Sequence, residues 1–197
     1  MQIYTIGHSN LSQEQFISLL NQYEIKAIAD VRSQPYSRYL PHFSQKQLQQ
    51  NLLQADIEYL FLGKQLGGRP THPDCYRNGK VLYDKVAETN DFAEGIATLL
   101  NLTKKTAVMC SEKDPINCHR AILICQHLKN YDREILHILN LGKIETQTDF
   151  EARLLKQTRL SNNPLQLSLF EQINPTSLLK QAYQYQGEKI AYQEKKD

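Results

Sequence analysis

The sequence predicts a three-layer, Rossmann-like α/β domain with a mainly parallel sheet of about five strands, followed by a C-terminal extension. Short apolar runs alternate with amphipathic stretches along residues 1–160, which is typical of strand–helix–strand units. The length of 197 residues and the 41% share of hydrophobic residues suit one soluble domain with a sizeable core. We therefore place the α/β domain at residues 1–160 and a flexible extension at residues 161–197.

The pattern of apolar residues places each element in order. The predicted strands are residues 2–6, 26–31, 58–62, 106–110 and 134–139. The predicted helices are residues 12–23, 44–55, 91–102, 118–129 and 148–160. Glycine, proline and polar residues predict a loop over 63–80, and the tail from 166 onward predicts flexible chain with a short helix near 177–186.

Three helix starts have the sequence signature of a capping box, in which a hydroxyl residue is followed three positions later by Gln or Glu. The pairs are Ser12 with Gln15, Ser44 with Gln47, and Thr148 with Glu151.

Composition narrows the class of function. The formal net charge of +2 predicts no polyanion partner from bulk charge alone. No apolar run approaches the roughly 20 residues needed to cross a bilayer, and MQIYTIGHSN lacks the pattern of a signal peptide. The four cysteines are too few and too unevenly spaced for a disulfide scaffold. We therefore expect reduced thiols, a cytoplasmic location and no membrane association.

Chemically distinctive residues follow four of the predicted strands. Ligands of open parallel sheets bind beyond the carboxyl ends of the strands, so we expect these residues to form one site. Loops at the opposite edge, residues 22–24 and 102–105, show no such selection. The candidates are His8, Ser9, Arg32, Ser33, Arg38, Gly67, Gly68, Arg69, Cys110, Glu112, Cys118, His119 and Arg120.

These residue types indicate an anion site beside a nucleophile. Arginines bind phosphate or carboxylate through paired donors, and glycines let the backbone approach a ligand. A thiol at a helix N-terminus beside Arg120 ionises readily, and His8, His119 or Glu112 can transfer protons. We therefore predict Cys110, Cys118, His119 and Glu112 as catalytic residues, and the other nine as substrate- or anion-binding residues.

Several of these features also have a structural interpretation. A single cysteine that ends a buried strand, as Cys110 does, is more often a small core residue. Arg32 can pair with Asp30 or Glu112, and His8 can cap a turn. Cys125, on an apolar helical face, is assigned to the core.

Two familiar types of site fit the spacing less well. Zinc held by Cys110, Cys118, His119 and His8 is the less favoured interpretation, because Cys-x7-Cys-His lacks the paired CxxC spacing of zinc sites. No cofactor is therefore predicted. Phosphatases and sulfurtransferases use a short loop between cysteine and arginine. Cys110 and Arg120 are too far apart for that loop, and Cys118 and Arg120 are too close.

The motifs TIGHS, DVRSQPYSR, LGKQLGGRP and MCSEKDPINCHR, followed by HIL, resemble the domain-of-unknown-function family 488 in order and spacing over residues 3 to about 140. The resemblance implies a compact α/β domain whose motifs meet at one site, and it implies no activity. The family's usual arginine- and tryptophan-rich region reads THPDCYRNGKVLYD here, so aromatic substrate contacts fall to Tyr76 or Tyr83. The signature residues it carries over are His8, Arg32, Arg38, Gly67, Gly68, Cys110, Glu112, Cys118, His119 and Arg120.

Residues 166–170 read QLSLF and resemble the pentapeptide by which bacterial replication and repair proteins dock on the DNA sliding clamp. Leu167 belongs to this motif, Leu169 and Phe170 would enter an apolar pocket, and Gln166 would fix the register. The alternative is that these side chains pack back on the domain.

Three classes of function stay open on sequence grounds. The first is an enzyme acting on a nucleic acid or nucleotide, linked to replication or repair. The second is a non-catalytic DNA-processing adaptor, and the third is a thiol redox protein using Cys110 and Cys118. An activity that requires Cys110 but not Cys118 would indicate a nucleophile. An activity that requires both cysteines would indicate redox or metal chemistry, and one that requires neither would indicate the adaptor.

Overall fold

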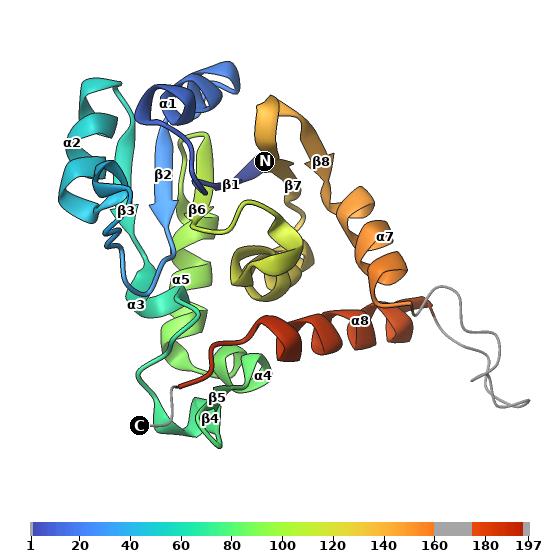
Figure 1. Ribbon diagram of the computed structural model, residues 1–197. Helices are drawn as coiled ribbons and strands as arrows, with labels where there is room; N and C mark the ends of the chain where they lie inside the picture. Colours follow the sequence, from blue (N-terminus) through green and yellow to red (C-terminus); the bar gives the residue numbers. More distant parts are fainter. Residues whose placement is uncertain (1, 160–174, 195–197) are drawn as a thin grey trace, which may run out of the picture.

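The computed structural model describes residues 2–159 and 175–194, which contain a mainly parallel six-stranded sheet flanked by helices (Figure 1). The strands are β1 (Gln2–Gly7), β2 (Ala27–Asp30), β3 (Glu58–Phe61), β6 (Thr106–Cys110), β7 (Glu134–Ile138) and β8 (Ile144–Thr146). Their order is β3-β2-β6-β1-β7-β8, and β8 is antiparallel to β7 while the other neighbours are parallel. The predicted fold class and its five strands are confirmed, and β8 has no counterpart among the predicted strands.

The central strands end at one edge. In the register of the sheet, Gly7 lies beside Cys110 and Asp30 lies beside Met109. The backbone N–H of His8 continues this pairing by donating to the carbonyl of Cys110 at 2.9 Å. The loops after β1, β2 and β6 therefore begin side by side, which is the arrangement that the parallel-sheet argument requires.

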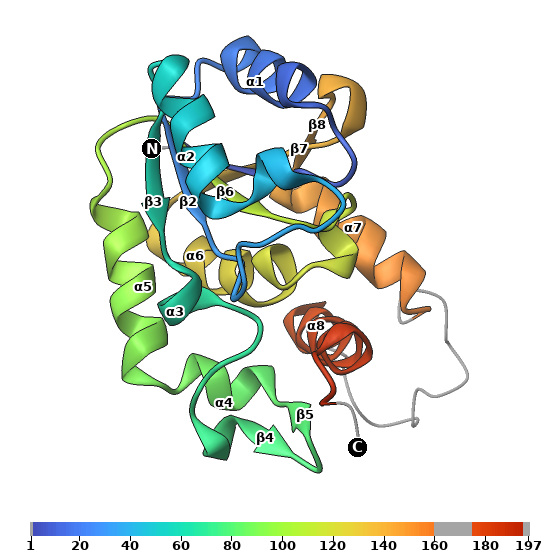
Figure 2. The same cartoon turned by 60° about the vertical axis from the view of Figure 1, so that its left-hand side comes forward.

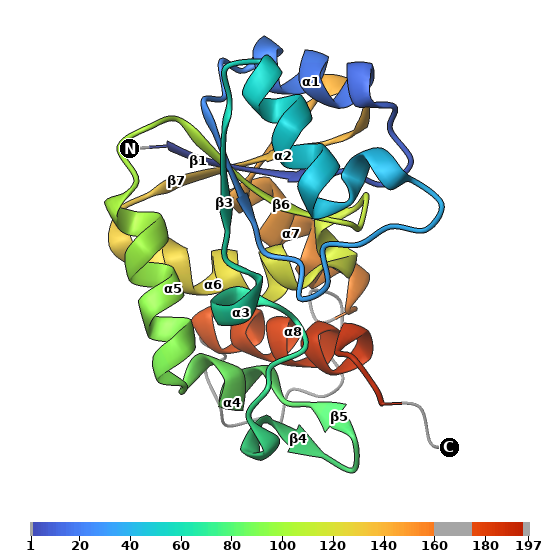
Figure 3. The same cartoon turned by 90° about the vertical axis from the view of Figure 1, so that its left-hand side faces the viewer.

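Helices cover both faces of the sheet (Figure 3). Alternate side chains of each strand point to opposite faces, so Ile6 belongs to the core on one face and Val108 to the core on the other. The first face is covered by α1 (Gln13–Gln22) and α2 (Gln45–Gln54), and the second by α5 (Asn90–Asn101) and α6 (Gln126–Leu128).

The predicted capping boxes differ in outcome. At α1 the Ser12 hydroxyl accepts from the Gln15 backbone, and the Gln15 side chain accepts from the Ser12 backbone. At α2 the Ser44 side chain makes no capping bond, because its oxygen accepts instead from the backbone N–H of Ser37 at 3.2 Å. The capping-box prediction is therefore confirmed at Ser12 and wrong at Ser44.

The predicted helix over 118–129 exists in altered form. Cys118 is extended, with φ of −133°, and follows a 3-10 turn (Pro115–Asn117). Residues Arg120–Cys125 then form a π-helix that runs into α6 and a second 3-10 turn (Lys129–Tyr131). π-Helical turns are rare and are frequent at functional sites.

The predicted loop over 63–80 contains regular structure (Figure 2). Its elements are α3 (Gly63–Leu66), a 3-10 turn (Pro73–Cys75) and the hairpin of β4 (Tyr76–Arg77) with β5 (Lys80–Val81), and α4 (Tyr83–Ala87) follows. The hairpin is joined to the C-terminal segment, because the N–H of Val81 donates to the carbonyl of Tyr192 at 3.0 Å and the N–H of Glu194 donates to the carbonyl of Gly79 at 2.8 Å.

The C-terminal part packs on the domain. The helix α7 (Gln147–Gln157) is capped by Thr146, so the start predicted at Thr148 is two residues late. The tail contains a helix, α8 (Pro175–Ile190), which buries Ala182, Tyr183 and Gln186. The short helix predicted near 177–186 is present and longer than predicted. The expectation of flexible chain is corrected for residues 175–194, because this helix has apolar partners on α7 and the π-helix. Residues 160–174, with QLSLF, lie outside the described residues. No helix within the described ranges is long and apolar enough to span a bilayer.

Candidate active site

A cavity of about 380 Å³ opens at the edge where the parallel strands end. It combines residues that follow β2, α3 and β6 with residues of the C-terminal segment. The residues predicted from the sequence that line it are Arg32, Ser33, Gly68, Arg69, Cys110, Glu112 and His119. The predicted residues that do not line it are His8, Ser9, Arg38, Gly67, Cys118 and Arg120.

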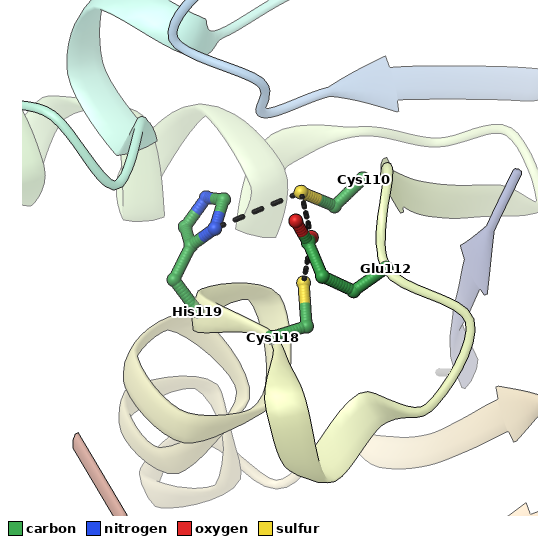
Figure 4. A group of neighbouring side chains, drawn as sticks. All are labelled: Cys110, Glu112, Cys118 and His119. Atoms are coloured by element: carbon green, nitrogen blue, oxygen red, sulfur yellow. Dashed lines mark hydrogen bonds between the residues drawn. The ribbon is translucent and has the colours of Figure 1, made fainter. Parts of the chain in front are cut away.

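Four of the predicted residues form a tight cluster at this cavity (Figure 4). One carboxylate oxygen of Glu112 lies 3.1 Å from the sulfur of Cys110 and 3.1 Å from the sulfur of Cys118. Nδ1 of His119 lies 3.7 Å from the sulfur of Cys110. One ligand atom from each of the four residues lies within 4.8 Å of the other three. The four predicted catalytic residues are therefore brought together, and we name them the Cys–Glu–Cys–His cluster.

Backbone contacts hold the cluster in place. Cys110 is the last residue of β6, in the centre of the sheet. The N–H of Cys118 donates to the carbonyl of Pro115 at 3.1 Å. Nε2 of His119 lies 3.1 Å from the carbonyl oxygen of Val31, just beyond β2. A carbonyl oxygen only accepts, so Nε2 carries the proton and Nδ1 faces Cys110.

The two thiols differ in their affinity for a proton. Burial opposes ionisation of Cys118, but the thiol of Cys110 donates a hydrogen bond to it and Arg120 lies nearby, so its pKa falls well below the usual range. The pKa of Cys110 is raised well above its usual range by that hydrogen bond and by burial. Burial and the charge on Cys118 raise the pKa of Glu112. Burial lowers the pKa of His119, but the hydrogen bond and charge of Cys118 outweigh it and the net shift is upward. Negative charge at this site is therefore favoured on Cys118 rather than on Cys110.

Arg120 lies behind the cluster. It is fully buried, and its Nη1 donates to the carbonyl of Glu112 at 2.7 Å. Its Nε lies 3.5 Å from the hydroxyl of Thr5. The structure thus departs from the predicted anion-binding role, because the guanidinium is turned inward, away from the cavity. It fixes the backbone that carries Glu112 and supplies positive charge beneath the sulfur atoms.

Arg32 lines the cavity, but most of its guanidinium donors already bond protein groups. Its guanidinium bonds both carboxylate oxygens of Asp30, at distances down to 2.6 Å, and donates to the carbonyl of Phe43 at 2.8 Å. Nη1 also lies 3.3 Å from Nε2 of His8. The pairing of Arg32 with Asp30 that the sequence leaves open is therefore present.

His8 has a supporting place rather than a position in the cavity. Its ring stacks on Phe43 with centroids 4.2 Å apart, and its Nδ1 lies 3.0 Å from the carbonyl oxygen of Ser9. Burial and then the charge of Arg32 lower the pKa of His8 to about 4, so the ring is neutral near pH 7. With both nitrogens engaged, His8 does not complete the zinc set considered from the sequence. The residue that lies with Cys110, Cys118 and His119 is Glu112.

Two glycines allow close approach around the cluster. A Cβ atom on Gly7 would lie 1.8 Å from the carbonyl oxygen of Glu112, so this position admits no side chain. A Cβ on Gly68 would lie 3.2 Å from Cγ of His119, so the glycine loop packs directly on the imidazole. The glycine pair predicted to approach a ligand therefore also approaches a residue of the cluster. Gly67 itself packs against Ser33.

Arg69 is the exposed cation of the cavity. Its backbone N–H donates to the hydroxyl of Ser33 at 2.9 Å, and its Nη1 donates to Gln34 at 3.3 Å. The guanidinium lies 4.2 Å from the ring centroid of Tyr192. Of the predicted anion-binding arginines, it is thus the one that faces the cavity without a carboxylate partner among the described residues.

The remaining predicted residues lie elsewhere. Arg38 is exposed and outside the cavity lining, and Ser9 bonds its neighbour Asn10. Of the two tyrosines suggested for aromatic contacts, Tyr83 lines the cavity, whereas the hydroxyl of Tyr76 donates to the carbonyl of Pro70 at 2.8 Å.

Sequence reasoning missed the C-terminal wall of the cavity, formed by Ile190 and Tyr192. The signal was present: residues 179, 182, 183, 186 and 190 recur at helical spacing and face the domain. Asn117 and Tyr36 also line the cavity and were not predicted.

A family described as Domain of unknown function DUF488 matches residues 12–126, more than half of the chain. The matched range contains the whole Cys–Glu–Cys–His cluster, together with Arg32 and Arg69, and it confirms the family expected from the motifs. No curated protein and no solved structure matches the chain.

Proposed function

This chain belongs to the family Domain of unknown function DUF488, and from its site we propose that it is an enzyme acting on a phosphate-containing substrate, a nucleotide or nucleic acid. One observation supports this most strongly. Cys110, Glu112 and His119 line the same cavity as Arg69. A reactive cluster and an exposed cation in one concave site are the arrangement expected of an enzyme with an anionic substrate.

Arg69 is the proposed phosphate ligand. Its guanidinium can form paired hydrogen bonds with phosphate oxygens, and its stacking on Tyr192 holds it at the cavity wall. The Cys–Glu–Cys–His cluster supplies the reactive group, with Cys110 as the sulfur residue at the cavity surface and Glu112 or His119 as the proton carrier.

Aromatic residues support a nucleotide rather than a simple anion. Tyr36, Tyr83 and Tyr192 line the cavity, and 74% of the Tyr36 surface is exposed. Bases stack on such rings without strong sequence preference, while an arginine holds the phosphate.

Binding of nucleoside monophosphates and fluorescently labelled single-stranded DNA tests this proposal. The Arg69→Gln variant should bind roughly tenfold to a hundredfold more weakly, because a hydrogen bond to a charged group contributes about 1.5–3 kcal/mol. Arg77→Gln, at an exposed position on the β4–β5 hairpin, is the matched control and should bind normally. Equal binding by both variants, or none by the wild type, would refute the proposal.

The link to replication or repair rests on QLSLF at residues 166–170, outside the described residues. We propose that Leu169 and Phe170 enter an apolar pocket of the sliding clamp while Gln166 and Leu167 set the register. An affinity near micromolar, about −8 kcal/mol, is expected after the cost of ordering the segment. Replacing Leu169 and Phe170 with alanine should abolish clamp binding and leave the unfolding free energy unchanged. A destabilised double variant would instead show that these residues pack on the domain.

A thiol redox function is the second candidate, favoured by the two sulfurs that share one oxygen of Glu112. An activity that survives Cys118→Ser and not Cys110→Ser would exclude it, whereas an activity that survives both would indicate the adaptor.

The four cysteines are all free, which supports the proposed cytoplasmic location.

A further inference from the structure

We propose that the Cys–Glu–Cys–His cluster binds one zinc ion, at the floor of the cavity. The donor atoms are the sulfurs of Cys110 and Cys118, Nδ1 of His119 and a carboxylate oxygen of Glu112. They come from two short segments, the end of β6 and the start of the π-helix, in the order Cys-x-Glu-x5-Cys-His. The inference does not depend on the proposed phosphate substrate. With zinc bound, Cys110 and His119 would be ligands and not a free nucleophile and proton carrier, so proton transfer would fall to Glu112.

The spacing of the donors fits a tetrahedral ion. Zinc bonds of about 2.0–2.3 Å place neighbouring ligand atoms roughly 3.3–3.8 Å apart. The two sulfur–oxygen distances to Glu112 are 3.1 Å, and the distance from the sulfur of Cys110 to Nδ1 of His119 is 3.7 Å. The other donor atoms lie within 4.8 Å of one another, so binding of the ion would draw them together by about 1 Å at most.

The imidazole is already oriented for a metal. Ligand histidines typically donate their second ring N–H to a carbonyl or carboxylate, which fixes the tautomer and the ring. In His119 this partner is the carbonyl of Val31, 3.1 Å from Nε2. Gly68 packs against the same ring and limits its rotation.

The charges around the cluster favour a divalent cation. Cysteine binds zinc as the thiolate, so in the zinc-bound site the two sulfurs and the carboxylate of Glu112 would carry three negative charges, with Arg120 as the buried cation beneath them. A zinc ion supplies the two charges that Arg120 leaves uncompensated. Thiolate and imidazole donors suit zinc and disfavour magnesium and calcium, which take oxygen ligands.

Glu112 is the ligand best placed to exchange. Its side chain is the exposed member of the cluster, whereas Cys110, Cys118 and His119 are buried. Catalytic zinc sites use three protein ligands and leave one position for water or substrate. Displacement of Glu112 would open such a position toward the cavity.

The test is the metal content of the full chain, purified with a reductant and without chelators. We expect one zinc ion per chain by mass spectrometry, and its loss in Cys118→Ser and His119→Gln. Cys75→Ser removes a buried cysteine outside the cluster and should keep the zinc. Because the site variants risk unfolding, cobalt substitution of the wild type gives an independent readout, with a tetrahedral spectrum and a thiolate-to-cobalt band expected. Folded wild-type protein that takes up neither metal, or zinc retained by folded Cys118→Ser, would overturn the proposal. Both outcomes are measured without substrate, so they are separate from the Arg69 binding test.

Discussion

The side chain of His119 is anchored to the backbone of Val31, with Nε2 3.1 Å from the carbonyl oxygen. This contact joins the end of β2 to the segment after β6, two strands that are neighbours in the sheet. It fixes the imidazole so that Nδ1 points at Cys110, and it therefore determines which nitrogen is free to act at the cavity. The imidazole is thus held by a main-chain contact at the edge of the sheet.

The buried pair of Asp30 and Arg32 supports the cavity wall, and its loss should be costly. Asp30→Asn leaves the guanidinium without its carboxylate, so the unfolding free energy should fall by roughly 3–5 kcal/mol. Asp56→Asn breaks the exposed pair with Lys26 and should cost about 1 kcal/mol or less. Denaturant unfolding of both variants measures the difference. Similar losses would show that the buried pair is not a structural support.

Stability should fall as the solution is acidified, partly through His137. Burial is the main reason that its pKa drops from 6.5 to about 3, so the folded protein keeps this ring neutral. The unfolded chain takes up the proton first, and stability is lost as the pH falls from about 6.5 toward 3. At pH 5 the unfolding free energy is expected to be about 2 kcal/mol lower than at pH values well above 6.5. The unfolding free energy should depend less on pH in His137→Gln than in the wild type, as measured by unfolding curves recorded at several pH values. The opposite pattern would contradict this assignment.

Alkylation of the cysteines should be selective. After removal of bound metal with a chelator, Cys110 or Cys118 should react much faster than Cys125. Cys110 lines the cavity, and the pKa of Cys118 is lowered, despite burial, by the hydrogen bond from Cys110 and by Arg120. Cys125 is fully buried, and burial raises its pKa to about 12. Zinc should slow the reaction of Cys110. Mass spectrometry over time resolves each site. Uniform, slow labelling with and without chelator would leave all the cysteines as core residues.

The helix α8 should contribute to the stability of the whole domain. Removing residues 160–197 exposes the apolar surface that Tyr183 covers and removes the hydrogen bond from Gln186 to the carbonyl of Ile116. We expect a loss on the order of 3 kcal/mol in unfolding free energy. A fully stable shorter chain would restore the view of the tail as an independent extension.

Local sequence patterns were sufficient to predict the parallel strands and the edge of the sheet at which the site lies. The apolar runs determined the five parallel strands, and the rule that ligands bind beyond strand ends brought Cys110 and Arg32 to one cavity. The capping box at Ser12 was also readable, because its two hydrogen bonds join residues three positions apart.

Long-range packing decided what the sequence did not reveal. Arg120 faces inward, where its Nε lies beside Thr5, which is 115 residues away in the sequence. The backbone of Gly7, which has no side chain, leaves room for its guanidinium. The helix α8 is fixed by contacts such as that of Gln186 with Ile116, 70 residues away. Periodicity can suggest a buried face, but it does not identify the surface that covers it.

The most direct measurement is anomalous diffraction at the zinc edge from crystals of zinc-replete protein grown without chelator. A single strong peak is predicted, within bonding distance of the sulfurs of Cys110 and Cys118 and of Nδ1 of His119. Well-ordered side chains with no peak between them, or a disulfide joining the two cysteines, would contradict the account.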